Sequence, residues 1–204
     1  MTEKTKGIVI ISIANGLIAL GYGLSVPFFA IYLSVHKNVS SGVIGLVLSL
    51  AMLTTAVASA ISGEVSDAFG RKRVMTISLL LRSITMLAIG LTIYLDTYYL
   101  WPIALHFAGC FFGAFFRPSS NAWIADNTTP TERIKAFGYI RIGLNLGWTI
   151  GPAMGGFLAG TSFASGFFLT GCIFLLSVFY VHKNIRETLA KTERRKSNFV
   201  QMLL

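Results

Sequence analysis

The stretch GEVSDAFGRKR, from Gly63 to Arg73, is the most informative part of the sequence. Five of its eleven residues are charged, whereas charged residues make up 12% of the chain as a whole. The stretch separates two long apolar runs, and its acids come before its bases. Such an ordered charge cluster predicts a short connection between two helices that cross a membrane.

The rest of the chain supports a membrane protein. Of its 204 residues 54% are hydrophobic and the mean hydropathy is +0.69, whereas a soluble domain carries about 25% charged residues. Apolar runs long enough to cross a bilayer as helices recur along the chain. The first run has a basic flank like a signal peptide, but it continues to about Leu33 without a cleavage site, so it is interpreted as a spanning helix.

We therefore predict an all-α membrane protein with six spanning helices. The expected spans are 7–33, 42–62, 74–95, 99–124, 138–160 and 164–182. Residues 1–182 form the transmembrane bundle, and residues 183–204 form a basic cytoplasmic tail or a linker.

The basic residues predict the orientation. Nearly all basic residues outside the spans are expected on one side of the bundle: Lys4, Lys6, Arg71, Lys72, Arg73, Arg133, Lys135, Lys183, Arg186, Lys191, Arg194, Arg195 and Lys196. Only Lys37 falls in a connection on the opposite side. The positive-inside rule makes the basic side cytoplasmic, with both termini there, in a multi-pass protein of the plasma (inner) membrane. Topology thus explains the net charge of +9, and no nucleic-acid partner is expected.

Three arginines remain inside the predicted spans, where a charge is costly unless it faces protein or water. Arg82 lies nine residues beyond Arg73, about 13 Å along a helix, which is deep for a side chain that snorkels to the surface. Arg141 is only a few residues into its span, so snorkelling explains it best. Arg117 lies on a polar face of the fourth span.

That face combines a titratable group, small residues and a cation. At helical spacing its members are His106, Gly109, Cys110, Gly113 and Arg117. It either lines a polar cavity, which we favour, or packs closely on another helix. Pro118 follows it and predicts a bend.

The first span has a related pattern. Its notable residues are Asn15, Gly16, Gly21, Gly23 and Pro27. Pro27 and Pro118 each fall about 20 residues into their spans, and on the same offset Asn15 corresponds to His106. This correspondence suggests a three-plus-three inverted repeat, as in many transporters.

The fifth span carries glycine at every fourth position. Gly143, Gly147, Gly151 and Gly155 form a groove that lets another helix approach closely, and Pro152 adds a kink. Arg141 and Asn145 lie four residues apart on a different, polar face. A glycine zipper alone explains the groove but not Asn145.

The opening stretch has a simpler alternative explanation. Bases that follow a span can merely mark its cytoplasmic end, which explains Arg71, Lys72 and Arg73 but neither Asp67 nor the two glycines. We expect Gly63 to end the second span and Gly70 to turn the chain into the third. Asp67 is then expected near the N-terminus of the third span, where the helix dipole favours a carboxylate.

These motifs resemble those of the major facilitator superfamily. Its signature between helices 2 and 3, G-x-x-x-D-(R/K)-x-G-R-(R/K)-(R/K), is matched at Gly63, Asp67, Gly70, Arg71, Lys72 and Arg73, with a departure at Ala68. The helix 5 signature of its drug-efflux antiporters, G-x-x-x-G-P-x-x-G-G, is matched at Gly147, Gly151, Pro152, Gly155 and Gly156. "IADNTTPTER" and "NIRETL" also fit the ends of helices 4 and 6.

The resemblance implies roles for particular residues. Asp67 and Arg71 would pair with Asp126 in a latch that locks the outward-facing state and breaks on switching. Helices 1, 2, 4 and 5 would line the central cavity, and the glycine-proline helix would seal it against leakage. The candidate cavity, substrate or proton residues are Asn15, His106, Arg117, Arg141 and Asn145. His106 falls near a position where such antiporters often have an arginine, which would alter proton coupling.

The resemblance also implies a function. It points to a secondary transporter that works by alternating access, with proton-coupled efflux of a small lipophilic or amphipathic compound. The alternatives are a metabolite importer or facilitator, and a non-transporting membrane scaffold. No phosphate-binding loop, metal-ligand cluster or nucleophile–base pair is present in the sequence, so neither a cofactor, a metal nor enzymatic activity is expected.

The family usually has twelve helices in two halves. We therefore favour an isolated N-terminal half, with a natural six-helix protein that acts as a homodimer as the alternative. The expected partners are the lipid bilayer, the small-molecule substrate, protons, and either a second half or a second copy.

Overall fold

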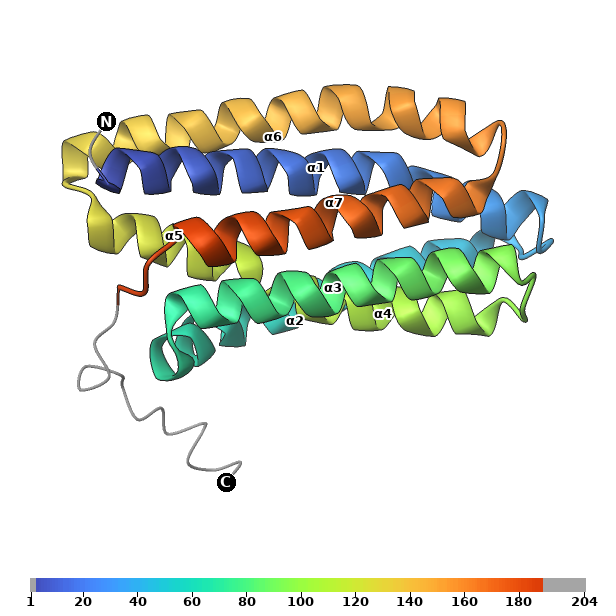
Figure 1. Ribbon diagram of the computed structural model, residues 1–204. Helices are drawn as coiled ribbons and strands as arrows, with labels where there is room; N and C mark the ends of the chain where they lie inside the picture. The colour runs from blue at the N-terminus through green and yellow to red at the C-terminus, as the bar shows by residue number, and fades with distance from the viewer. Residues whose placement is uncertain (1–2, 189–204) are drawn as a thin grey trace.

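The computed structural model describes residues 3–188 and is a helical bundle (Figure 1). Its helices are α1 (Glu3–Val35), α2 (Ser41–Phe69), α3 (Arg71–Tyr94), α4 (Leu100–Gly113), α5 (Phe116–Asn127), α6 (Pro130–Ala159) and α7 (Phe163–Asn184). Because α4 and α5 follow one another in a single crossing, the seven helices make six crossings, as the sequence predicts. The tail residues 189–204 and the bases predicted there lie outside the described part.

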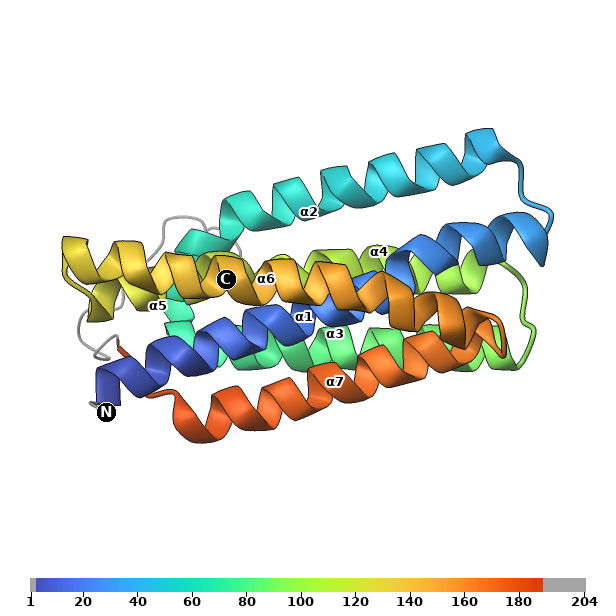
Figure 2. The same ribbon diagram turned by 90° about the horizontal axis from the view of Figure 1, so that it is seen from above.

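Five of these crossings are long and apolar enough to span a membrane by length and composition, within the described residues. They comprise α1, α2, α3, the α4–α5 pair and α7. Helix α6 does not qualify by these measures, because glycines and polar side chains are interspersed along it. It nevertheless runs alongside α1 for most of its length (Figures 1 and 2).

One end of the bundle holds the N-terminus, the α2–α3 and α5–α6 connections and the end of α7 (Figure 1). The predicted cytoplasmic bases of the described residues lie at this end, which we call the basic end. The opposite end holds the α1–α2, α3–α4 and α6–α7 connections.

Helix packing agrees with a three-plus-three inverted repeat. In such a repeat the first three crossings exchange places with the last three, so that α1 exchanges with α4–α5, α2 with α6, and α3 with α7. The extensive α1–α6 contact then corresponds to the α2–α4 contact, and the α1–α7 contact corresponds to the α3–α4 contact. The α3–α7 contact maps onto itself. All of these contacts are present, although α1 packs on α6 much more extensively than α2 packs on α4. The helix pairing thus agrees with the repeat, and the closeness of packing differs between its halves.

Glycines bring α1 and α6 together. A Cβ added at Gly143 would lie 2.7 Å from the Ser12 carbonyl oxygen, and one at Gly151 would lie 2.7 Å from the Leu20 carbonyl oxygen. Gly155 is similarly close to α1. The backbones therefore meet directly along the predicted glycine groove, as in other close membrane helix pairs.

The core consists of two apolar clusters, one towards each end. The cluster near the basic end includes Ile11, Met75, Trp123, Ile124 and Val181. The cluster near the opposite end includes Phe29, Leu33, Met86, Ile89 and Phe167. The middle of α1 and α3 lies between them, and polar residues gather in this layer.

The fourth crossing breaks between α4 and α5, at Ala114 and Phe115. Pro118 has no N–H to donate to the carbonyl of Ala114, so the break lies one turn before the proline, close to where the sequence predicts a bend. The Phe115 carbonyl accepts hydrogen bonds from Ser62 Oγ (3.1 Å) and Ser119 Oγ (2.8 Å). The broken turn is therefore tied to α2.

Two helix boundaries differ from expectation. Helix α2 continues through Gly63 to Phe69, so Gly63 does not end it and Asp67 lies in its last turn rather than at the start of α3. Gly70 alone makes the turn, with φ of 100°, a conformation that favours glycine. Helix α6 begins at Pro130, earlier than predicted, because Thr129 and Glu132 form a capping box.

Candidate functional site

The first candidate site is a charge cluster at the basic end, formed by Asp67, Arg71 and Asp126. Arg71 Nε donates to Asp126 Oδ2 at 2.7 Å, and Arg71 Nη1 lies 3.0 Å from Asp67 Oδ1. Asp67 ends α2, Arg71 begins α3 and Asp126 ends α5. One guanidinium therefore bridges carboxylates from two other helices, and the structure brings together the three residues that the resemblance singled out.

The segment after α7 joins this cluster. Thr188 Oγ1 donates to Asp126 Oδ2 at 3.1 Å, and the Arg71 backbone N–H donates to Glu187 Oε1 at 2.9 Å. Trp123 Nε1 donates to the Arg186 carbonyl at 2.8 Å, which holds the segment against α5. The sequence predicted the three charged members of the cluster but not these contacts, which come from residues more than 60 positions away from Trp123 and Asp126.

The remaining signature residues have a smaller part. Lys72 and Arg73 make no ion pair within residues 3–188, and Arg73 is exposed. Gly63 is exposed, and a Cβ added there would meet nothing within 4 Å. Ala68 is half-buried in the last turn of α2 and has no side chain that reaches Asp126.

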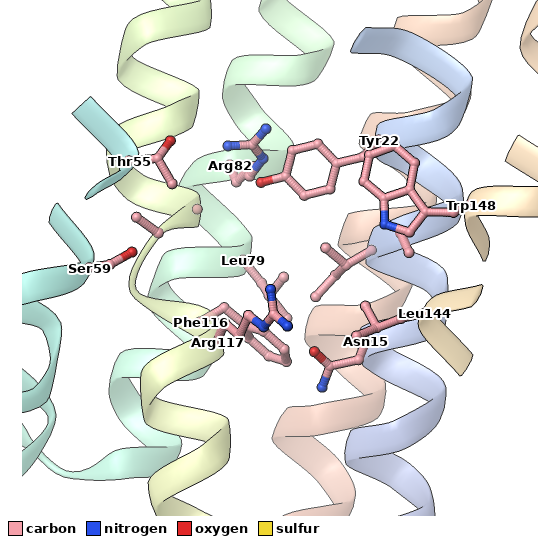
Figure 3. A pocket seen from close by; sticks show the side chains of 14 residues that line it. Asn15, Tyr22, Thr55, Ser59, Leu79, Arg82, Phe116, Arg117, Leu144 and Trp148 are labelled. Atoms are coloured by element: carbon pink, nitrogen blue, oxygen red, sulfur yellow. The ribbon is translucent and has the colours of Figure 1, made fainter. Parts of the chain in front are cut away.

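The second candidate site is a cavity of about 270 Å³ in the layer between the two apolar clusters (Figure 3). Helices α1, α2, α3, α4, α5 and α6 all contribute to its lining. Its polar and aromatic lining residues are Asn15, Tyr22, Thr55, Ser59, Arg82, Phe116, Arg117 and Trp148.

Two of the five predicted cavity residues lie here. Asn15 is buried and donates from Nδ2 to the Ile11 carbonyl at 2.9 Å, which turns its amide along the helix. Arg117 is exposed, and its guanidinium lies on the same side of the cavity as Asn15 (Figure 3).

The other three predicted residues lie elsewhere. His106 is buried, stacks on Phe29 with ring centroids 4.8 Å apart, and has Nε2 3.7 Å from Cys110 Sγ. The face of α4 that carries it mainly packs closely, because a Cβ at Gly109 would lie 2.8 Å from Thr85 Oγ1. Close packing, the alternative left open by the sequence, thus describes most of that face.

The polar face of α6 also lies outside the cavity. Arg141 and Asn145 are exposed on the surface of the bundle, whereas Leu144 and Trp148 of the same helix line the cavity. On the glycine side, Pro152 Cδ would lie 2.8 Å from a Cβ added at Gly23. Gly156 is less crowded, since a Cβ there would be at an ordinary 3.6 Å from Phe28.

Arg82 is a cavity residue that was not among the predicted site residues. It is 1% exposed, and its Nη1 donates to the Gly109 carbonyl. Its Cζ lies 4.3 Å from the ring centroid of Tyr22, a cation–π contact, and Tyr22 in turn stacks on Trp148 at 6.3 Å. The sequence signal for Arg82 was its depth within an apolar run. No comparable signal marks Tyr22 or Trp148.

Comparison with known proteins decides the family. The sequence profile of the Major Facilitator Superfamily matches residues 11–202, nearly the whole chain. The chain belongs to the major facilitator superfamily. The resemblance seen in the two signatures is therefore confirmed, and the helical bundle is a half of the superfamily's fold.

Relatives in the superfamily include drug-resistance proteins. Multidrug resistance protein 2 of Bacillus subtilis is 31% identical over 98% of this chain and 51% of its own length. The quinolone resistance protein NorA of Staphylococcus aureus is 28% identical over 84% of this chain and 44% of its own. The chain thus spans about half the length of the relatives it matches. Membership in a superfamily of transporters also confirms the expectation that the chain is not an enzyme.

A solved structure of the superfamily has the same fold. The human organic anion transporter MFSD10 (TETRAN) superposes with a TM-score of 0.71 at 18% identity, over 97% of this chain and 51% of its own. At this identity the similarity establishes the architecture alone. One half of that transporter thus corresponds to the bundle described above.

Proposed function

We propose that the chain is one six-helix half of a secondary transporter that exports a small amphipathic compound by alternating access. The charge cluster of Asp67, Arg71 and Asp126 is the observation that carries this proposal, because it ties three helices together at one end of the bundle. In a rocking mechanism such a cluster holds one end closed and must break for the other state to form. The drug-resistance names of the relatives favour efflux.

The bundle presents a large apolar surface that a second six-helix unit would cover. Helix α2 is the least buried of the five crossings that qualify as membrane spans, with Leu46, Met52, Leu53 and Val57 all exposed. Arg141 of α6 is also exposed, and a charge on a membrane helix faces protein or water rather than lipid. A second half or a second copy would thus complete the central cavity between the units, with the basic end in the cytoplasm.

Proton coupling requires a group that titrates during transport. No carboxylate lines the cavity among the described residues, so in this proposal the proton-carrying acid lies on the second unit. His106 remains a candidate proton carrier because of its position in the sequence, although it packs outside the cavity.

The test is flux in proteoliposomes loaded with ethidium or 2-naphthoate, with and without an imposed pH gradient. Proton-coupled transport predicts saturable flux of at least one of these compounds that increases with the gradient. Flux that does not change with the pH gradient would exclude proton coupling but not transport itself. Native mass measurement in lipid would show whether the six-helix chains pair, which is the alternative of a homodimer.

A further inference from the structure

We propose that the cavity beside Arg82 binds the anionic group of a small aromatic or amphipathic compound, held by Arg82 through two parallel hydrogen bonds. This inference deepens the proposed function and rests on it, because it takes the cavity as part of the place where the transported compound sits. It concerns the substrate class, which neither the charge cluster nor the relatives settle.

The first support is that Arg82 lacks acceptors. A guanidinium has five N–H donors, and burying it unpaired costs several kcal/mol. Arg82 is 1% exposed, and Nη1 donates to the Gly109 carbonyl. Nε and Nη2 are buried without a hydrogen-bond partner in the structure. The side chain is thus held in place while most of its donors remain unused.

The second support is which nitrogens are unused. Nε and Nη2 share one edge of the planar guanidinium, and this edge binds a carboxylate through two parallel N–H···O bonds. Gly113 of α4 lies beside the guanidinium, since a Cβ added there would lie 2.5 Å from Nη1 and 2.9 Å from Nε. The glycine therefore leaves space next to this edge that any larger residue would fill.

The third support is charge. The acidic residues of the described chain beyond α1 lie at helix ends or in connections: Glu64, Asp67, Asp96, Asp126, Glu132 and Glu187. None of them lines the cavity, whereas Arg82 and Arg117 both do. The cavity is therefore cationic at low dielectric, where an unbalanced positive charge attracts an anion strongly.

The fourth support is the aromatic wall. Tyr22 lies over the Arg82 guanidinium at 4.3 Å, and Trp148 stacks beside Tyr22 with an interplanar angle of 17° (Figure 3). Flat aromatic groups pack well against such a pair. Since neither free nitrogen is exposed, a ligand reaches the guanidinium edge only when a neighbouring side chain moves.

These features define the compound by its chemistry. It has one carboxylate or sulfonate, which pairs with Arg82, and an aromatic body that replaces the contact of Tyr22. A cavity of about 270 Å³ admits a compound of modest size. A lipophilic cation is disfavoured, because it would meet two guanidiniums and no acid.

Binding to the protein in lipid nanodiscs tests the inference. The probes are 2-naphthoate, its neutral isostere 2-naphthamide, and the cation 2-naphthylmethyl-trimethylammonium, titrated by calorimetry. Hydrogen bonds to a charged group predict that naphthoate binds about tenfold or more tightly than naphthamide, and that the cation binds most weakly. Arg82→Gln should abolish the preference for naphthoate. Arg82→Lys should retain part of it, since lysine keeps the charge but not the two-pronged edge.

Lys135→Gln is the control. It removes an exposed cation at the basic end that does not line the cavity, so the preference should persist. If Arg82→Gln fails to fold, the comparison of naphthoate with naphthamide on the unaltered protein still decides.

Equal affinity for the three probes, or a preference for the cation, would overturn the inference and leave the proposed transport standing. A preference for the cation would mean that an acid of a second unit neutralises Arg82. Binding of none of the probes to folded protein would also overturn it, and the flux assay then judges transport separately. A preference for naphthoate that persists in folded Arg82→Gln would overturn the role of Arg82.

Discussion

Arg71 and Arg82 lie eleven residues apart on the same helix, α3, and have opposite surroundings. Arg71, at the basic end, contacts the carboxylates of Asp67 and Asp126. Arg82, in the middle of the bundle, contacts a carbonyl and an aromatic ring but no acid of residues 3–188. A paired arginine stabilises one arrangement of helices, whereas a buried unpaired arginine costs stability and is retained for a ligand or partner. The difference separates a conformational role from a binding role.

Charge reversal at Asp126 should have the largest effect. Asp126→Arg places two guanidiniums together, so we expect flux to fall at least about tenfold and the unfolding temperature to fall by about 2–8 °C. Adding Arg71→Asp to this variant should restore part of the flux and part of the unfolding temperature, because positions 71 and 126 again carry opposite charges. Lys72→Asp, at a base without an ion pair in the described chain, is the control. If Asp126→Arg lowers neither the flux nor the unfolding temperature, the charge cluster does not hold this end of the bundle closed.

The two arginines should respond oppositely to replacement by methionine. Arg82→Met removes an unpaired buried charge, and we expect the unfolding temperature to rise by about 2–8 °C. Arg71→Met leaves two carboxylates unpaired and should lower it. Thermal unfolding in detergent gives both values in one experiment. A fall for both variants would mean that Arg82 is balanced by something beyond the contacts described above.

The segment after α7 offers a finer test of the cluster. Thr188→Val removes the hydrogen bond to Asp126 Oδ2, and we expect a loss of about 0.5–1.5 kcal/mol in the free energy of unfolding. Thr149→Val removes an exposed hydroxyl that bonds only to its own helix, at the Asn145 carbonyl, and serves as the control. Equal losses in the two variants would show that Thr188 adds nothing specific to the cluster.

The smallest effect is expected at the opposite end, where Lys37 Nζ lies 2.6 Å from Asp96 Oδ1. The hydrogen bond between them lowers the pKa of Asp96 from 3.8 and raises the pKa of Lys37 from 10.5. The Asp96 contribution is present above pH 3.8 and is lost as pH falls through the lowered pKa. The Lys37 contribution is present below pH 10.5 and is lost as pH rises through the raised pKa.

Asp96→Asn should therefore lower the unfolding temperature by about one degree or less at neutral pH, because exposed pairs contribute little. The difference from the unaltered protein should vanish at both pH extremes and shrink at high salt. A difference that grows in acid would contradict the assignment.

The sequence predicted the fold well, because membrane crossings are long apolar runs with basic flanks. It predicted Asp67 and Arg71 through a signature with fixed spacing, and Asp126 through the resemblance that this signature carries. It placed Gly63 at a helix end, whereas α2 continues to Phe69, since a helix in this environment readily tolerates an exposed glycine.

The cavity was harder to predict. Helical periodicity shows that His106 and Arg117 share a face, but only tertiary packing shows that His106 meets Phe29 while Arg117 reaches the cavity. The position of Arg82 deep within an apolar run was visible in the sequence. Its importance for binding, however, depends on the absence of acids around it among residues 3–188. That absence is a property of several helices at once, and spacing along one helix does not reveal it.

We propose that the charge cluster governs conformational exchange while the cavity governs binding. The most direct measurement compares 2-naphthoate affinity in nanodiscs with 2-naphthoate flux in proteoliposomes for the unaltered protein and Asp67→Asn. We expect unchanged affinity, within about twofold, and flux reduced at least about tenfold, because Asp67 contacts Arg71 and lies outside the cavity. Unchanged flux in Asp67→Asn, or affinity lost in parallel with flux, would contradict it.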